Sequence, residues 1–170
     1  RELLTVSEIV ESLEMILRHT SCRLVLTLSP VRHIGEGMED NSLSKALLRV
    51  AVNEIVSKHR DRVAYFPAYE IMMDDLRDYR FYDSDMVHPS ELAIGYIADK
   101  FFDAALSKEA KALKLRVDKI VQATEHRPFN PTSEAYRRFV EQQLAAISAI
   151  EGVDLSKEKS YFESALQINL

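Results

Sequence analysis

Asp85 and His88 are the two residues whose types and spacing are best suited to chemistry. They stand three positions apart in the segment Asp85-Met-Val-His-Pro-Ser90, which follows a predicted strand and precedes a predicted helix. In an open α/β sheet, ligands bind at the carboxyl ends of the strands, where such a loop lies. At this spacing the Asp carboxylate can accept a hydrogen bond from the imidazole Nδ1–H, which leaves Nε2 free to take a proton from a hydroxyl nucleophile. The spacing alone more often accompanies a loop Asp that caps a helix beside a partly exposed His, so both interpretations stay open.

A second group of candidates lies in the segment Ser29-Pro-Val-Arg-His33, directly after the first predicted strand. This position is at the same edge of the sheet as the Asp-x-x-His segment. The planar guanidinium of Arg32 could bind an anionic or hydroxyl-bearing part of a substrate, and His33 could form a second polar wall. Alternatively, Arg32 pairs with a loop carboxylate such as Asp78 or Asp83 and orders the site.

Composition excludes several other functions. The 170 residues carry a net charge of −5, which argues against a nucleic-acid partner because phosphate binding needs a basic surface. No apolar run is long enough to span a bilayer, so no membrane partner is expected. Neither a metal nor a cofactor is expected, because the Asp and His residues lack the spacing of calcium or zinc sites. The single cysteine, Cys22, fits a reducing compartment and favours the cytoplasm.

Two short apolar segments predict the strands that would position these residues. Residues 22–28 and 62–66 are rich in strand formers, and each is followed by a proline-containing turn. A helix with Asn41 or Ser42 as its N-cap joins them, and strand–helix–strand order is typical of a parallel α/β sheet covered on both faces.

Helices with one apolar face surround the predicted strands. Thr5 and Glu8 have the spacing of a capping box that begins a helix over about residues 6–18. Short helical spacing also covers residues 69–76, and Pro89 suits the first turn of another helix. The apolar positions predicted to face inward on the first two long helices are Val6, Ile9, Val10, Leu13, Ile16, Leu17, Leu43, Ala46, Leu47, Val50, Ala51 and Ile55.

The chain divides into two parts that differ in their sequence pattern. Residues 1–106 carry the α/β pattern, whereas residues 107–170 show alternating charge, prolines and sparse apolar stripes that predict a helical extension. Two strands are few for a parallel sheet. Since the sequence begins with Arg1 and not Met, we expect either that it continues upstream with further strands or that the chain assembles into a homo-oligomer.

Several segments together carry a resemblance to a known family. They are Ser29-Pro-Val-Arg-His33, Asn41, Ser44-Lys45, Tyr65-Phe-Pro-Ala-Tyr-Glu-Ile-Met-Met73, Asp75-Leu-Arg-Asp-Tyr-Arg-Phe-Tyr82, Asp85-Met-Val-His-Pro-Ser90 and His126-Arg-Pro-Phe129. The first six resemble the later two-thirds of the GSCFA domain, a family similar to SGNH hydrolases, and the last resembles the C-terminal region of that family.

The resemblance implies a flavodoxin-like, three-layer α/β fold, of which this chain is a part, and ester hydrolysis through a Ser–His–Asp relay. It assigns the base to His88 and the orienting acid to Asp85. The early SGNH motifs that carry the nucleophilic Ser and the oxyanion-hole Gly and Asn are not found in this sequence. Ser29 is a poor replacement, because Pro30 follows it and no glycine elbow surrounds it.

The sequence therefore predicts an ester hydrolase in the intact parent protein, acting on a small or sugar-linked acyl ester. This chain would contribute the Asp–His half of the relay and show little activity alone. The alternative is a non-catalytic interaction module whose helical extension packs on a partner.

Overall fold

The computed structural model describes residues 2–35 and 37–167 of the chain. It separates into two compact units, Arg1–Ala104 and Ala105–Leu170. The first unit carries the strands and the candidate site, and the second is helical.

The first unit is built on two parallel strands, β1 (Leu24–Thr27) and β2 (Val63–Phe66), in the register Leu24↔Val63 and Thr27↔Phe66. The predicted mixed α/β class and parallel pairing are confirmed. Both strands are shorter than the predicted ranges. One reason is Pro67, which directly follows β2 and has no N–H to extend the hydrogen-bond ladder.

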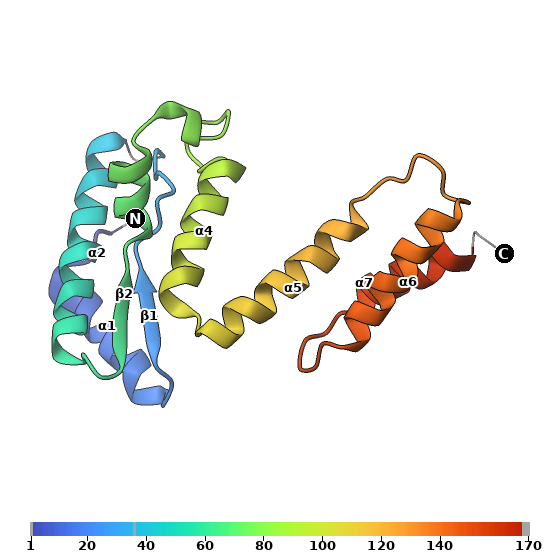
Figure 1. The fold of residues 1–170 in the computed structure, drawn as a ribbon. Helices are drawn as coiled ribbons and strands as arrows, with labels where there is room; N and C mark the ends of the chain where they lie inside the picture. Colours follow the sequence, from blue (N-terminus) through green and yellow to red (C-terminus); the bar gives the residue numbers. More distant parts are fainter. Residues whose placement is uncertain (1, 36, 168–170) are drawn as a thin grey trace. The chain divides into compact units, whose positions relative to one another are not determined.

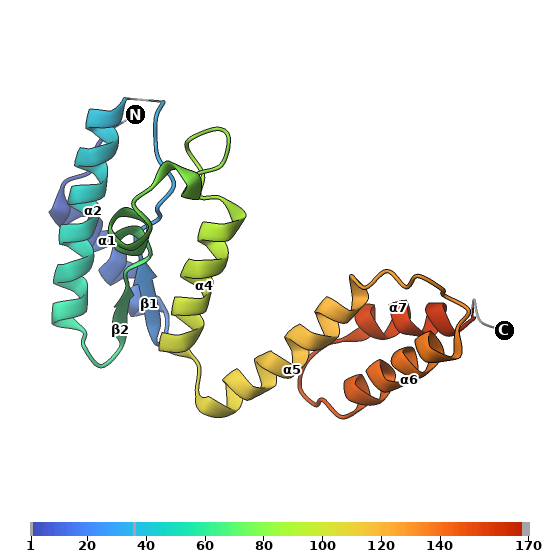
Figure 2. The ribbon, with the colours of Figure 1, turned by 45° about the horizontal axis from the view of Figure 1, so that its top comes forward.

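Helices cover both faces of this small sheet (Figures 1 and 2). On one face, α1 (Val6–His19) and α2 (Met38–Lys58) bury a cluster that includes Val63 of β2. On the other face, Phe66 contacts Phe101 of α4 (Glu91–Ala105) edge to face, with ring centroids 5.0 Å apart. Successive side chains of a strand point to opposite faces, so Val63 and Phe66 serve different helices.

The starts of the first two long helices differ in how well the sequence predicts them. The capping box of Thr5 and Glu8 is present at α1, as predicted. The second helix, α2, begins at Met38 after Gly37, earlier than the predicted caps Asn41 and Ser42. Gly37 has φ +95°, a conformation that favours glycine and turns the chain into the helix. Asn41 lies inside the helix, where its side-chain oxygen accepts the backbone N–H of His33.

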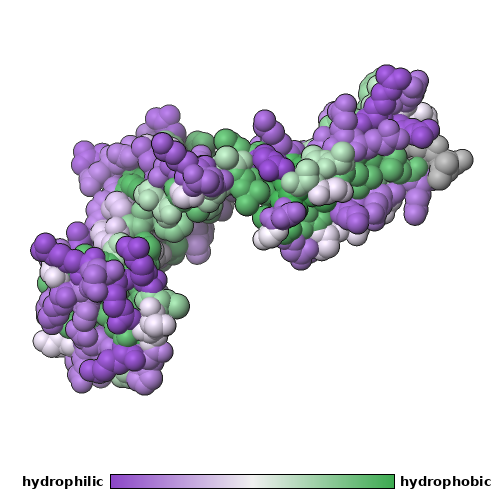
Figure 3. Space-filling model, turned by 60° about the horizontal axis from the view of Figure 1, so that its bottom comes forward, coloured by the Kyte–Doolittle hydropathy of each residue, from purple (hydrophilic) through white to green (hydrophobic). Residues whose placement is uncertain are grey.

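Four positions predicted to face inward are exposed instead. Ile16 of α1 is 53 % exposed, Leu43 and Val50 of α2 are 49 % and 55 % exposed, and Ala46 of α2 is exposed as well. The buried stripe of α2 is narrower than predicted and consists of Ala51, Val52 and Ile55. A two-stranded sheet offers too little surface to cover both flanks of these helices. Figure 3 shows apolar side chains reaching the surface between polar ones.

After β2 the chain turns through α3 (Ala68–Glu70), which continues as a π-helical turn over Ile71–Leu76. A 3₁₀ turn, Tyr79–Phe81, and a loop then lead to α4. Met72 and Leu76 are buried against Ala93 at the start of α4. This packing fixes both ends of the segment that contains the Asp-x-x-His motif.

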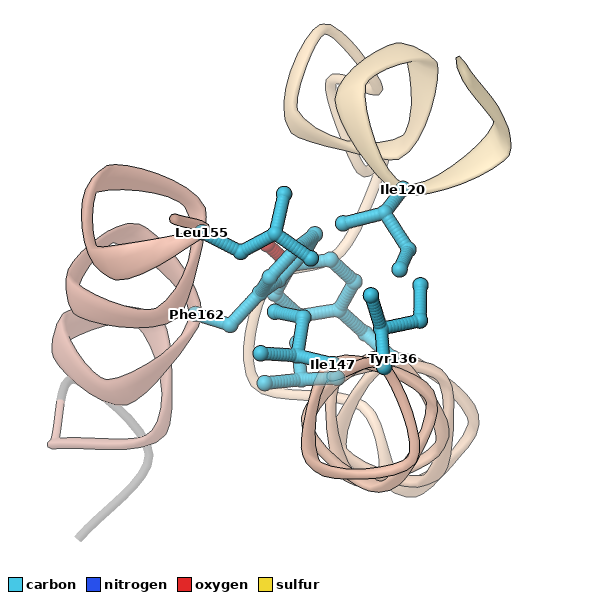
Figure 4. Packing of buried hydrophobic residues seen from close by; sticks show 7 residues of the cluster. Ile120, Tyr136, Ile147, Leu155 and Phe162 are labelled. Atoms are coloured by element: carbon cyan, nitrogen blue, oxygen red, sulfur yellow. The ribbon is translucent and has the colours of Figure 1, made fainter. Parts of the chain in front are cut away.

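The second unit is formed by α5 (Lys108–Thr124), α6 (Glu134–Ser148) and α7 (Ser156–Gln167), consistent with the predicted helical character. Ser107 and Ser133 cap the first two of these helices by accepting backbone N–H groups. Figure 4 shows side chains from all three helices meeting in one core, which comprises Ile120, Tyr136, Val140, Ile147, Ile150, Leu155 and Phe162.

Candidate active site

The Asp-x-x-His motif lies on a closed loop whose ends are hydrogen-bonded to each other. Tyr82 and Pro89 form an antiparallel bridge, and the N–H of Ser90 donates to the carbonyl of Phe81 at 2.8 Å. Within the loop, the N–H of Asp83 donates to the carbonyl of His88 at 2.8 Å. These backbone hydrogen bonds therefore fix the position of His88 on the loop.

Asp85 and His88 are brought together within this loop. Oδ2 of Asp85 lies 2.6 Å from Nδ1 of His88. Oδ1 of Asp85 accepts the N–H groups of Val87 at 2.8 Å and His88 at 3.0 Å. The His88 side chain is 61 % exposed, so its Nε2 is open to an incoming group. This is the geometry that orients an imidazole as a base.

Met86 makes this geometry possible because its backbone reverses direction between the two residues. Its φ is +60°, in the left-handed region, which costs a non-glycine residue about 1–2 kcal/mol. The turn points two successive N–H groups at the Asp85 carboxylate. Such a conformation persists only where surrounding contacts support it.

The same contacts lower the pKa of Asp85 to about 2. The largest cause is the backbone N–H of His88, followed by the His88 side chain and the N–H of Val87. Each of these donors stabilises the charged carboxylate. Asp85 is therefore ionised at neutral pH.

Arg32 reaches this loop from the segment after β1. Its N–H donates to the carbonyl of Val87 at 3.1 Å, and its guanidinium donates to the carbonyl of Met86 at 3.1 Å. The guanidinium also lies over the ring of Tyr82, 3.9 Å from the centroid. The predicted partner Asp78 pairs with Arg80 instead.

His33 lies apart from these contacts. Its N–H donates to Oδ1 of Asn41 at 2.8 Å, and the residue lines a cavity of about 270 Å³ together with Asp40, Ser44 and Leu47. The structure thus joins Arg32 to the His88 loop, whereas it places His33 at a different cavity.

Ser29 and Lys45 show how the segment before Arg32 is held. The Ser29 hydroxyl accepts the N–H of Val31 at 3.3 Å. Nζ of Lys45 donates to the carbonyl of Val31 at 2.9 Å and also to that of Ser29. The sequence did not predict this role of Lys45, because the lysine lies about two turns into α2 and the carbonyls it binds are 16 and 14 residues away.

Arg32 also lines a hollow of about 170 Å³, to which neither Asp85 nor His88 contributes. Two aromatic rings, Tyr79 and Tyr82, line it together with Arg32, Arg77 and Asp78. Tyr79 is 68 % exposed. The hollow therefore presents flat aromatic surface beside both hydrogen-bond donors and acceptors.

Other sites are not indicated in the part of the chain that the structure describes. Residues 2–35 and 37–167 hold no group of three or more His, Cys, Asp or Glu side chains arranged to bind a metal ion. None of the helices described there is long and apolar enough to cross a membrane. Asp74 lies beside Arg77 at 3.6 Å on an exposed surface.

The fold and the loop define an α/β protein that carries an Asp–His pair on the loop between the second strand of a parallel sheet and α4. The chain belongs to the GSCFA family, whose model matches residues 1–101. Residues 117–168 match the model of the GSCFA domain protein C-terminal domain. No curated protein and no solved structure matched the chain.

Proposed function

We propose that this chain supplies the acid and base of an SGNH-type ester hydrolase. The observation that carries the proposal is the 2.6 Å contact between Asp85 Oδ2 and His88 Nδ1, with the imidazole otherwise open to solvent. An ionised Asp85 keeps the proton on Nδ1, so that Nε2 can act as the base.

In the proposed reaction, Nε2 of His88 takes the proton of a serine hydroxyl as the serine oxygen attacks the ester carbonyl. The protonated imidazole then donates that proton to the leaving alcohol, and an acyl-serine forms. Water, deprotonated by His88, attacks the acyl-serine and releases the acid and the free serine. The serine is expected from a segment of the intact parent outside these 170 residues.

The proposed fold of the intact domain is a flavodoxin-like, three-layer sheet in which β1 and β2 are the last two strands. Support comes from their parallel pairing and from helices on both faces. In such sheets the ligand binds at the carboxyl ends of the strands, which is where the segment with Arg32 and the loop with His88 follow β1 and β2.

For the substrate we propose a small or sugar-linked acyl ester. The hollow lined by Arg32 supports this choice, because a sugar ring needs a flat apolar surface and neighbouring polar groups. Tyr79 and Tyr82 offer the flat apolar surface, and Arg77 and Asp78 offer the polar groups. Arg32 and His33 remain proposed substrate contacts, although only Arg32 lines this hollow.

The test is hydrolysis of an activated acetyl ester by the intact parent protein. His88→Ala should lower turnover at least about 10³-fold, because the base is lost. His126→Ala is the matched control, since His126 lies in the second unit, where its ring contacts Phe139, and it should leave turnover unchanged. Undiminished turnover by His88→Ala would contradict the proposal. Strong, His88-dependent turnover by the 170 residues alone would instead point to a local serine such as Ser29.

The alternative function, a non-catalytic interaction module, has one supporting observation. Phe129 is fully exposed in the loop between α5 and α6, and phenylalanine is among the aromatic residues enriched in the cores of protein–protein interfaces. If the intact parent shows no His88-dependent hydrolysis, the interaction module becomes the favoured function, with α5, α6 and α7 as the part that binds a partner.

A further inference from the structure

We propose that Arg32 is the positioning residue of the His88 loop: it holds Met86 and Val87 in the conformation in which Asp85 can orient His88. The consequence for catalysis rests on the proposed function. The structural part can be measured without turnover.

Arg32 contacts the loop at its base and at its tip. The base is Tyr82, whose ring lies under the guanidinium at 3.9 Å. The tip is formed by Met86 and Val87, whose carbonyls accept the side chain and the backbone N–H of Arg32, each at 3.1 Å. One residue thus joins both parts of the loop to the segment after β1.

The two accepting carbonyls belong to the two residues between Asp85 and His88. Met86 holds the left-handed turn, which needs support from its surroundings. Val87 donates its own N–H to Asp85. If Arg32 released these carbonyls, the turn could relax and both N–H groups would move away from the Asp85 carboxylate.

Arg32 is itself held in place from α2. Lys45 donates to the carbonyls of Ser29 and Val31, the latter directly before Arg32. A continuous set of hydrogen bonds therefore runs from α2 through Lys45 and Arg32 to the loop. Because α2 is a helix of 21 residues, these contacts hold the loop against a rigid element.

The side-chain contacts require an arginine, whereas the backbone N–H of residue 32 donates to Val87 whatever the side chain. A guanidinium can stack its face on a ring while an edge N–H donates to a carbonyl, whereas an ammonium offers no such plane. Substrate binding by Arg32, the other role predicted from the sequence, would use guanidinium N–H groups besides the one that donates to Met86. The two roles differ in what a substitution changes: positioning affects kcat, and uniform substrate binding affects KM.

The first experiment uses the 170-residue chain and NMR. Arg32→Met should speed amide hydrogen exchange of Val87 and His88 at least about tenfold, because their N–H groups lose a fixed acceptor. The pKa of Asp85 should rise from about 2 towards its ordinary value of 3.8. Arg32→Lys should behave like Arg32→Met, and it provides a second variant if the first fails to fold.

Arg77→Met is the matched control, since Arg77 lines the same hollow but its ion-pair partner is Asp74 on the surface. It should change neither the exchange rates nor the pKa of Asp85. Unchanged exchange and an unchanged Asp85 pKa in a folded Arg32→Met chain would overturn the proposal. Wild-type exchange rates and a wild-type Asp85 pKa in Arg32→Lys would also overturn it, because a positive charge without the guanidinium plane would then be enough to hold the loop.

The second experiment measures acetyl-ester hydrolysis by the intact parent. Arg32→Met should lower kcat about tenfold or more with KM within about twofold, as expected for a misplaced base. A raised KM with unchanged kcat would assign Arg32 to substrate binding instead. If the parent shows no hydrolysis at all, the proposed function fails, and the NMR result still decides whether Arg32 positions the loop.

Discussion

At the scale of single residues, three donors from the segment Val87–His88 converge on one carboxylate. The sequence was sufficient to predict that Asp85 could reach His88, because the two are three positions apart on one loop. It could not predict the partners of Arg32. The Arg32–Met86 hydrogen bond joins residues 54 positions apart, and it depends on how the loop folds back.

The Asp85 carboxyl should make stability depend on pH on the acid side. Its pKa is about 2 in the folded chain against an ordinary 3.8, so the unfolded chain binds more protons between these values. The stabilisation is thus fully present above about pH 4 and is lost as pH falls through about 2. Urea unfolding of wild type and Asp85→Asn from pH 5 to 2 measures this, and the variant should show a weaker dependence. A carbon-13 titration that places the Asp85 carboxyl near pH 4 would contradict it.

At the scale of elements, burial in the second unit is concentrated in a few side chains. Phe162 of α7 is fully buried, whereas Phe129 is fully exposed. Phe162→Ala should therefore reduce the free energy of unfolding by about 3–5 kcal/mol, because it leaves a cavity in the core. Phe129→Ala is the matched control and should change stability by less than about 0.5 kcal/mol. Chemical denaturation followed by circular dichroism measures both, and equal effects would show that the core is misassigned.

The elements also show where prediction from sequence ends. Thr5 and Glu8 predicted the start of α1 correctly because a capping box is a local interaction. The N-cap of α2 is Gly37, so the predicted caps Asn41 and Ser42 lie four or five residues too late; Asn41 resembles a cap but accepts the N–H of His33. Leu43 and Val50 lie on the apolar pattern of α2, yet the surface that would cover them depends on the number of strands in the sheet. That number is a property of the tertiary fold and is not contained in the periodicity of one helix.

At the scale of the whole molecule, the first unit presents surfaces that ordinarily have a partner. In the part of the chain that the structure describes, β1 pairs with β2 along one edge and has no strand on the other. Val25 of β1 is 53 % exposed, and Leu92 and Ile94 of α4 are 67 % and 56 % exposed. An open strand edge beside apolar side chains recruits other chains.

We therefore predict that the 170-residue chain self-associates in solution through the β1 edge or the neighbouring helix faces. Val25→Lys should weaken this association at least about tenfold, because a lysine on an edge strand opposes strand addition. Leu115→Lys is the control: Leu115 lies on α5 in the second unit and is 62 % exposed, so it matches the change in polarity without altering the edge. Light scattering over a range of concentrations measures the assembly. A monodisperse monomer at every concentration would refute the prediction. Only the Val25 change places a charge on the unpaired strand, so equal weakening by both variants would assign the contact to exposed apolar side chains in general.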